Sequence, residues 1–326
     1  MYTLLMSVLI CCLIQALPVM AAPASKTLKL AHNHNRSHPV HTAMKYMGER
    51  VRELSGGALR IRIYSGGVLG PQRENIEQLQ LGALDMAKTS ASELESFDPV
   101  YRVFSFPYLF RDQRHLHGVV RGKLGRSILE GSSSRGFRGL TFYESGARHF
   151  YAKKVIHSAS DLQGLKVRVQ PSRTLLQMVQ QMGGLPSPIN YGELYTALQQ
   201  GVVDAAENNL TSFVVSRHGE AARFFSWSGH TMIPDVLMVS TESWKALSAE
   251  QQVILQQAAT ESSGEMVKLW DEAQRKNLEL AKKSGITFVE PDRDSFVKAV
   301  QPMYRQLQKD NPKLYSLVER IRKEEG

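Results

Sequence analysis

Hydrophobic positions in the first part of the chain follow two different periods. Val40, Met44, Met47 and Val51 recur at helical spacing within residues 39–54. Residues 59–64 instead alternate apolar and polar side chains, as a half-buried strand does. The expected elements are strand 27–31, helix 39–54, strand 59–64, helix 71–81 and strand 83–88. This order predicts an α/β unit in which helices cover a mostly parallel sheet.

The same pattern restarts after a long loop that contains residues 104–108. The expected elements there are strands 140–144, 150–153, 166–169 and 203–206, and helices 172–182 and 192–200. Two successive α/β units of similar size predict two lobes. Ligands of open α/β sheets bind where loops converge at the carboxyl ends of strands. Polar side chains at or just after expected strand ends are therefore candidates for a binding site: Asn33, Ser90, Arg148 and Asn208.

The last third of the chain changes character. Residues 224–227 and 236–240 are expected to form strands that cross back between the lobes. Ser248 is a suitable N-cap, and Gln251 completes a capping box for a helix that continues to Lys283. A helix of about 35 residues is roughly 50 Å long, so it would have to span both lobes. A final strand at 286–289 and a charged helical tail from Arg293 complete the expected fold.

The N-terminal residues resemble a secretory signal. Residues 4–20 are mostly apolar and uncharged, and the small residues Ala21, Ala22 and Ala24 follow. Both cysteines, Cys11 and Cys12, lie in this segment. A lipoprotein signal is disfavoured because Ile10, the residue before Cys11, is not small. We therefore expect a signal peptide at residues 1–24 and a mature chain that folds without disulfides in an oxidising compartment.

The formal net charge of +9 belongs entirely to the expected mature chain, because the signal segment has no charged side chain. Its lysines and arginines are dispersed and form no basic run interleaved with aromatic residues, so nucleic-acid binding is not expected. A positive surface would favour the approach of anionic solutes.

Arg168 is the most unusual residue of the pattern. It lies between Val167 and Val169 in a short strand that otherwise reads as buried, and its guanidinium stays charged. Arg148 lies near the mouth of another expected strand. Two arginines at strand mouths could clamp one carboxylate, which would indicate an anionic ligand. The alternative is two separate structural salt bridges.

The sequence contains little that indicates catalysis or metal binding. His32, His34, His38 and His41 cluster near the N-terminus, but no carboxylate is spaced to complete a metal site. No nucleophile elbow, mature cysteine or phosphate-binding loop is present. Asp204 and Glu207 are close in sequence, but this spacing alone does not make an acid–base pair. We expect no catalytic residue, no metal and no cofactor.

Several motifs then occur in an order that resembles one family, the periplasmic solute-binding proteins of tripartite ATP-independent periplasmic (TRAP) transporters. The resemblance runs from about residue 26 to about residue 310. Its motifs are residues 67–70 (GVLG), 78–86 (QLQLGALDM), 106–110 (FPYLF), 161–168 (DLQGLKVR), 191–201 (YGELYTALQQG) and 204–208 (DAAEN).

The resemblance implies a two-lobed periplasmic-binding-protein fold with mixed sheets, a hinge and a long lobe-spanning helix. Its expected boundaries are lobe I at 25–146 plus 236–270 and lobe II at 147–235 plus 271–326. It also implies a monomeric periplasmic receptor that is not an enzyme and delivers its ligand to integral membrane subunits. The family pattern makes Arg168 the anchor of a substrate carboxylate, with Arg148 and Asn208 assisting. By position, the rest of the pocket would be Asn33, Gln72, Ser90 and Tyr191.

The sugar-acid branch fits better than the sialic-acid or dicarboxylate branches. Residues 144–148 (ESGAR) and 207–209 (ENN) resemble the hexuronate binders, and uncharged pocket residues suit hydroxyl groups. Gln72 departs from this pattern, because close sugar-acid relatives often carry an acidic residue there. The alternatives are a receptor for a dicarboxylate or keto acid, a receptor that feeds a sensor kinase, and a secreted α/β lyase or hydrolase acting on a sugar acid.

Overall fold

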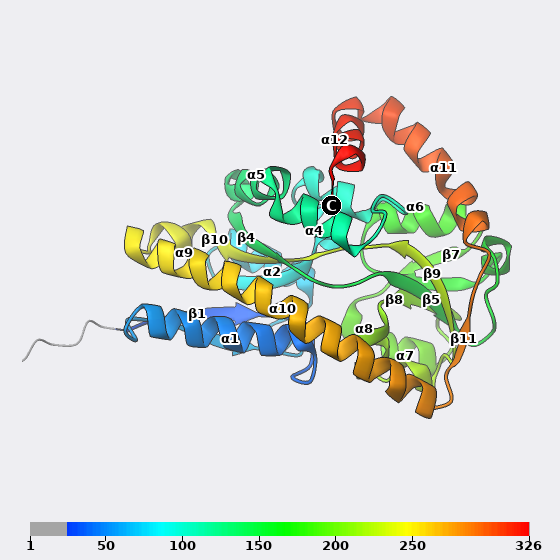
Figure 1. The fold of residues 1–326 in the computed structure, drawn as a ribbon, viewed down its shortest axis with the longest axis horizontal. Coiled ribbons are helices and arrows are strands. Elements are labelled where there is room, and N and C mark those ends of the chain that lie inside the picture. The colour runs from blue at the N-terminus through cyan, green and yellow to red at the C-terminus, as the bar shows by residue number, and fades with distance from the viewer. Residues whose placement is uncertain (1–24, 326) are drawn as a thin grey trace, which may run out of the picture.

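A computed structural model describes residues 25–325 (Figure 1). The expected signal peptide, residues 1–24, lies outside the described residues. The described part contains two β-sheets with helices packed around them. One sheet has the strand order β2-β1-β3-β10-β4, and the other has the order β11-β9-β5-β8-β6-β7. The predicted α/β fold with mixed sheets is confirmed.

The first sheet is parallel across β2, β1 and β3, and antiparallel where β10 joins β3 and β4. The predicted parallel sheet is thus confirmed only for its first three strands, because β10 returns from late in the chain. The strands of this sheet are β1 (Lys26–Ala31), β2 (Leu59–Tyr64), β3 (Met86–Ser90), β4 (Phe137–Tyr143) and β10 (Asp235–Ser240).

The second sheet is also mixed. β6 is parallel to β7 and β8, whereas β5 is antiparallel to β8 and β9. Its strands are β5 (Arg148–Ala152), β6 (Lys166–Val169), β7 (Leu185–Pro188), β8 (Ala205–Asn208), β9 (Phe224–Thr231) and β11 (Thr287–Val289). The chain therefore passes between the sheets after β4 and again after β9, and these two short connections join the lobes. The exact residue boundaries of the lobes stay a prediction.

The α-helices cover the outer faces of the sheets. Those that come before the second sheet are α1 (Pro39–Leu54), α2 (Gln72–Gln80), α3 (Ala91–Leu94), α4 (Gln113–Arg121) and α5 (Lys123–Gly131). The others are α6 (Arg173–Gln181), α7 (Leu194–Gln199), α8 (Leu210–Val215), α9 (Thr241–Lys245), α10 (Ala249–Lys283), α11 (Arg293–Asp310) and α12 (Pro312–Lys323). Helix α1 buries Val40, Met44, Met47 and Val51, the positions that its sequence period selects.

The predicted long helix is confirmed as α10, which has 35 residues. The Ser248 hydroxyl accepts the backbone N–H of Gln251, and the Gln251 side chain accepts the backbone N–H of Ser248, so both halves of the capping box are present. Figure 1 shows α10 crossing the molecule beside both sheets. It packs against α1 and β4 at one lobe and against α8 at the other.

Two strand boundaries differ from the sequence prediction in a way that affects the site. The expected strand 83–88 is shifted to β3 because Ala83 and Leu84 bond back to the Gln78 carbonyl and continue the end of α2. Arg148 does not close the strand before it but begins β5, because residues 144–147 form the connection between the sheets. As a result Ser90 and Asn208 end their strands, whereas Arg148 starts its own.

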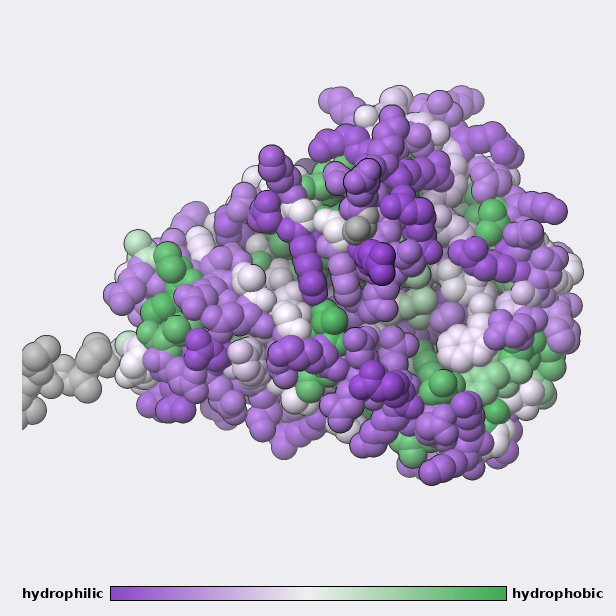
Figure 2. All heavy atoms as spheres, viewed as in Figure 1, coloured by the Kyte–Doolittle hydropathy of each residue, from purple (hydrophilic) through white to green (hydrophobic). Residues whose placement is uncertain are grey.

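The surface in Figure 2 is mainly hydrophilic, and hydrophobic residues appear in separate groups. Among the described residues, none of the helices combines the length and the hydropathy that a membrane span requires. The large apolar side chains are instead concentrated in the interior, where Trp270 of α10 is 1% exposed.

Candidate functional site

Three of the seven predicted site residues line one cavity between the lobes. Asn33, Gln72 and Tyr191 surround a space of about 170 Å³ together with Glu93 and the loops 66–71 and 190–193. The first loop follows β2, and the second follows β7 in the other sheet. A larger groove of about 770 Å³ lies between α1, β2 and α10, but it contains none of the predicted residues. The smaller cavity is therefore the candidate site.

Arg168 is fully buried in the middle of β6. Its Nε donates to the Ile189 carbonyl oxygen at 2.8 Å, which fixes the direction of the side chain. Nη1 and Nη2 have no acceptor among the described residues. Burial lowers the pKa of Arg168, while the nearby Glu207 carboxylate raises it. A buried guanidinium with its two terminal nitrogens unpaired is a strong attractor for a carboxylate.

Arg148 lies in a different environment from Arg168. Its Nε and Nη2 donate to the two carboxylate oxygens of Glu207 at 2.5 and 2.7 Å, forming a bidentate pair. Nη2 also donates to the Glu207 carbonyl, and Nη1 donates to Asn208 Oδ1, both at 3.0 Å. These four hydrogen bonds leave one of the five guanidinium N–H donors available. The salt-bridge interpretation therefore applies to Arg148 but not to Arg168.

Glu207 is the buried counter-charge of this site. Burial alone would raise its pKa, but Arg148 and the hydrogen bond from His230 lower the pKa to about 2. The residue is thus ionised at neutral pH. Asn208 follows it at the end of β8 and uses Oδ1 to accept from Arg148 and from the Asn209 backbone N–H. This leaves the Asn208 amide group as its remaining donor.

Gln72 holds a second buried carboxylate. Its Oε1 accepts the Ser90 backbone N–H at 2.9 Å, and its Nε2 donates to Glu93 Oε1. The other Glu93 oxygen, Oε2, is buried and has no partner among the described residues. Burial raises the pKa of Glu93 to about 7, although Arg168 and Gln72 lower it. The amide at position 72 therefore orients an acidic side chain that comes from α3.

Several hydrogen bonds join the two lobes beside the cavity. Ser90 at the end of β3 and Ser92 in α3 donate to Gln170 Oε1 just after β6, at 3.4 and 3.0 Å. Glu95 accepts the backbone N–H of Thr174 in the first turn of α6 at 3.1 Å. None of these acceptors or donors lines the cavity. They hold the lobes together through protein groups alone.

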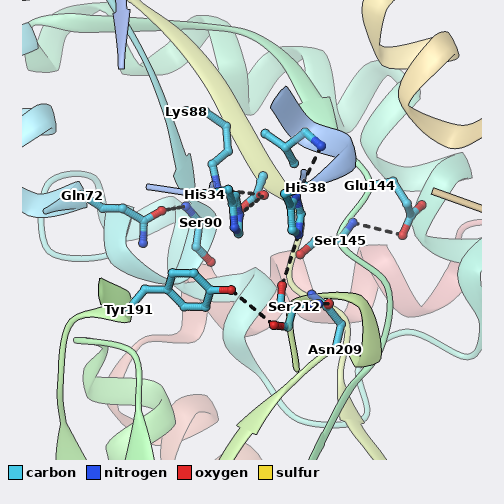
Figure 3. Close-up of polar contacts among 12 residues, drawn as sticks. His34, His38, Gln72, Lys88, Ser90, Glu144, Ser145, Tyr191, Asn209 and Ser212 are labelled. Atoms are coloured by element: carbon cyan, nitrogen blue, oxygen red, sulfur yellow. Dashed lines mark hydrogen bonds and ion pairs between the residues drawn. The ribbon is translucent and has the colours of Figure 1, made fainter. Parts of the chain in front are cut away.

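Histidines form another contact between the lobes (Figure 3). The rings of His34 and His38 stack at 3.8 Å, and the Tyr191 ring meets His34 edge-on at 5.3 Å. Because His38 Nδ1 accepts the Val40 backbone N–H, the neutral ring carries its proton on Nε2, which lies 3.3 Å from Ser212 Oγ in α8. Tyr191 in turn bonds Ser216 Oγ at 2.5 Å.

The other two histidines of the N-terminal cluster, His32 and His41, also contact protein groups. His32 Nε2 lies 3.0 Å from His41 Nδ1. Next to this cluster, Lys88 and Asp235 form a buried ion pair at 3.0 Å. Within residues 25–325, no group of three His, Cys, Asp or Glu side chains is arranged to hold a metal ion.

Acidification is expected to destabilise the folded protein between pH 7 and pH 5. Burial lowers the pKa of His34 and His38 well below 6.5, and nearby Lys88 lowers it further. Stability from keeping these rings neutral is complete above pH 6.5 and is lost as the pH falls, because the unfolded chain takes up the protons. Urea unfolding at several pH values measures the slope of the free energy of unfolding against pH.

His38→Asn is expected to make this slope shallower, because one buried titrating ring is removed. His157→Asn, at an exposed histidine, is the matched control and is expected to leave the slope unchanged. Equal slopes for the parent and the His38 variant would contradict the assignment of this pH dependence to the buried His38 ring.

Sequence reasoning missed Glu93 and Gln170 and left Glu207 without a role. Glu93 lies three residues beyond Ser90, on the short helix that begins where β3 ends. A polar residue just after a strand end is the signal that could have selected it. Glu207 contacts Arg148 only because β5 and β8 are antiparallel neighbours, which the local sequence does not reveal.

A model of the bacterial extracellular solute-binding proteins, family 7, matches residues 30–311. The chain belongs to this family. A solved TRAP periplasmic solute-binding protein from Bradyrhizobium, in complex with galacturonate, is 40% identical with a TM-score of 0.88, covering 91% of this chain and 99% of the other. A second from Xanthobacter autotrophicus, also with galacturonate, is 35% identical with a TM-score of 0.89, covering 91% and 100%.

A third solved TRAP periplasmic solute-binding protein, from Roseobacter denitrificans, holds glucuronate. It is 32% identical with a TM-score of 0.89, covering 92% of this chain and 100% of the other. The predicted family and its two-lobed fold are thus confirmed. Family 7 proteins of TRAP transporters are substrate-binding receptors that take small acid ligands and work with membrane subunits.

Proposed function

We propose that this chain is the periplasmic receptor of a TRAP transporter for a hexuronate or a related sugar acid. The observation that carries the proposal is the Arg168 guanidinium, which is fully buried, leaves Nη1 and Nη2 unpaired, and interacts electrostatically with Glu93, a residue that lines the cavity. Such a group gains most from a ligand carboxylate that accepts two parallel hydrogen bonds. Relatives of the same fold that hold galacturonate and glucuronate support the ligand class.

The other predicted residues then take different roles. Arg148 adds its one remaining N–H donor to the ligand carboxylate, and Asn208 adds its amide group from the same side. Asn33, Gln72 and Tyr191 line the space for the sugar hydroxyls. Ser90 positions Gln72 through its backbone N–H.

The receptor acts by closing its lobes around the ligand and presenting the closed form to the membrane subunits. We further propose that residues 1–24 are a signal peptide removed on export and that the mature protein is monomeric. The sequence of the expected signal segment and the family support this placement.

A thermal-shift screen tests the ligand class. Galacturonate and glucuronate are expected to stabilise the protein, and a ligand at 100 times its dissociation constant adds about 2.7 kcal/mol. Succinate and 2-oxoglutarate serve as the dicarboxylate and keto-acid controls and are expected to have little effect. Stabilisation by these controls alone would overturn the sugar-acid assignment. Recovering the bound sugar acid unchanged after incubation would distinguish a receptor from a lyase or hydrolase.

A further inference from the structure

Glu93 provides a negative group at the cavity that the sequence pattern did not select. It is 4% exposed and lines the cavity with Asn33 and Gln72. Gln72 Nε2 donates to one carboxylate oxygen and thereby fixes the orientation of the group. The second oxygen, Oε2, is buried without a partner among the described residues. A buried carboxylate oxygen of this kind requires a hydrogen-bond donor.

The unpaired polar groups of Arg168 and of two cavity-lining residues, Glu93 and Asn33, are of opposite kinds. Arg168 offers N–H donors on Nη1 and Nη2, whereas Glu93 Oε2 and Asn33 Oδ1 offer only acceptors. Arg168 and Glu93 interact electrostatically, because the guanidinium lowers the pKa that burial of Glu93 raises. The site therefore has a donor side suited to a carboxylate and an acceptor side suited to O–H groups.

We propose that Glu93 is a specificity-determining residue, which accepts a hydrogen bond from a ligand hydroxyl and rejects a second ligand carboxylate. This inference rests on the proposed function, since it concerns the far end of the same ligand. A hydroxyl supplies the missing proton and forms a charge-assisted hydrogen bond with Oε2. A second carboxylate has no proton to donate and would place two negative charges side by side in a buried space.

The Gln72 amide contributes to this specificity by orienting the Glu93 carboxylate. An acidic residue at position 72 would stand directly against Glu93, so one of the two carboxyl groups would have to stay protonated. Gln72 Nε2 instead satisfies Oε1, and Gln72 Oε1 is held by the Ser90 backbone N–H. With an amide at position 72, Glu93 on α3 is the acidic residue that can accept a hydrogen bond from a ligand hydroxyl.

Calorimetry with two matched ligands tests the inference. Galacturonate has one carboxylate, whereas galactarate has a carboxylate at each end. At pH 8, above the pKa of Glu93 near 7, the parent protein is expected to bind galacturonate at least tenfold more tightly than galactarate. Glu93→Gln is expected to weaken galacturonate binding about tenfold, which is about 1.4 kcal/mol, and to reduce the preference between the two acids, since the hydrogen bond to a charged acceptor is lost.

Asp98→Asn is the matched control. Asp98 is also a buried carboxylate, but it accepts from Ser132 Oγ and the Val100 backbone N–H and does not line the cavity. Both affinities are expected to match the parent. Equal binding of the two acids by the parent, or an unchanged preference in Glu93→Gln, would overturn the role of Glu93. Failure of the parent to bind any hexuronate would overturn the proposed function instead.

Discussion

Replacing Arg168 with methionine is expected to weaken hexuronate binding by about 3–5 kcal/mol, roughly a hundredfold to a few thousandfold. The ligand carboxylate would remain in a buried site without its counter-charge. Stability of the protein without ligand is expected not to fall, because the side chain makes one hydrogen bond, to Ile189, and leaves Nη1 and Nη2 unpaired. Calorimetry measures the affinity, and urea unfolding measures the stability.

Arg173→Met is a matched control for this variant. Arg173 lies at the start of α6 with an exposed side chain, so its removal changes the net charge by the same amount. Its affinity for a hexuronate is expected to equal that of the parent. If Arg168→Met also bound the sugar acid as tightly as the parent, the anchor would have to lie elsewhere.

Replacing Arg148 with methionine is expected to lower mainly the stability of the fold, whereas replacing Arg168 lowers mainly the affinity for the ligand. Glu207 would stay buried without its bidentate partner, which costs about 3–5 kcal/mol. A loss of this size lowers the melting temperature by roughly 10 °C in a protein of this size. Thermal unfolding in the absence of ligand measures the change.

The double variant Arg148→Met with Glu207→Gln provides the control. It removes the uncompensated charge as well as the arginine, so part of the lost stability is expected to return. An Arg148 variant that melts with the parent would show that the pair is not structural. The two arginines are thus separable experimentally, one by affinity and the other by stability.

Periodicity and capping signals predicted much of the fold because those signals are local. The apolar stripe of α1 and the capping box of Ser248 and Gln251 depend on residues a few positions apart, and both are present in the structure. Arg168 could be selected as unusual for the same reason, since its two apolar neighbours in the strand reveal its burial.

The partners of these residues could not be predicted because they depend on strand order and lobe packing. Arg148 meets Glu207 only through the pairing of β5 with β8, and Gln72 meets Glu93 only where α2 packs beside α3. The sequence therefore left two interpretations open for Arg148, and the packing favours one. Glu93 carried a local signal, its position just after a strand end, but its contact with Gln72 depends on the same non-local packing.

The hydrogen bonds from Ser90 and Ser92 to Gln170, and from Thr174 to Glu95, join the lobes without lining the cavity. They contribute to the closing equilibrium by the same amount whichever solute is enclosed. Apparent affinity scales with the fraction of receptor that can close, so substitutions at these positions would shift the dissociation constants of all ligands by a common factor. Evolution can therefore adjust this receptor to scarce or abundant nutrients without changing which nutrient it prefers.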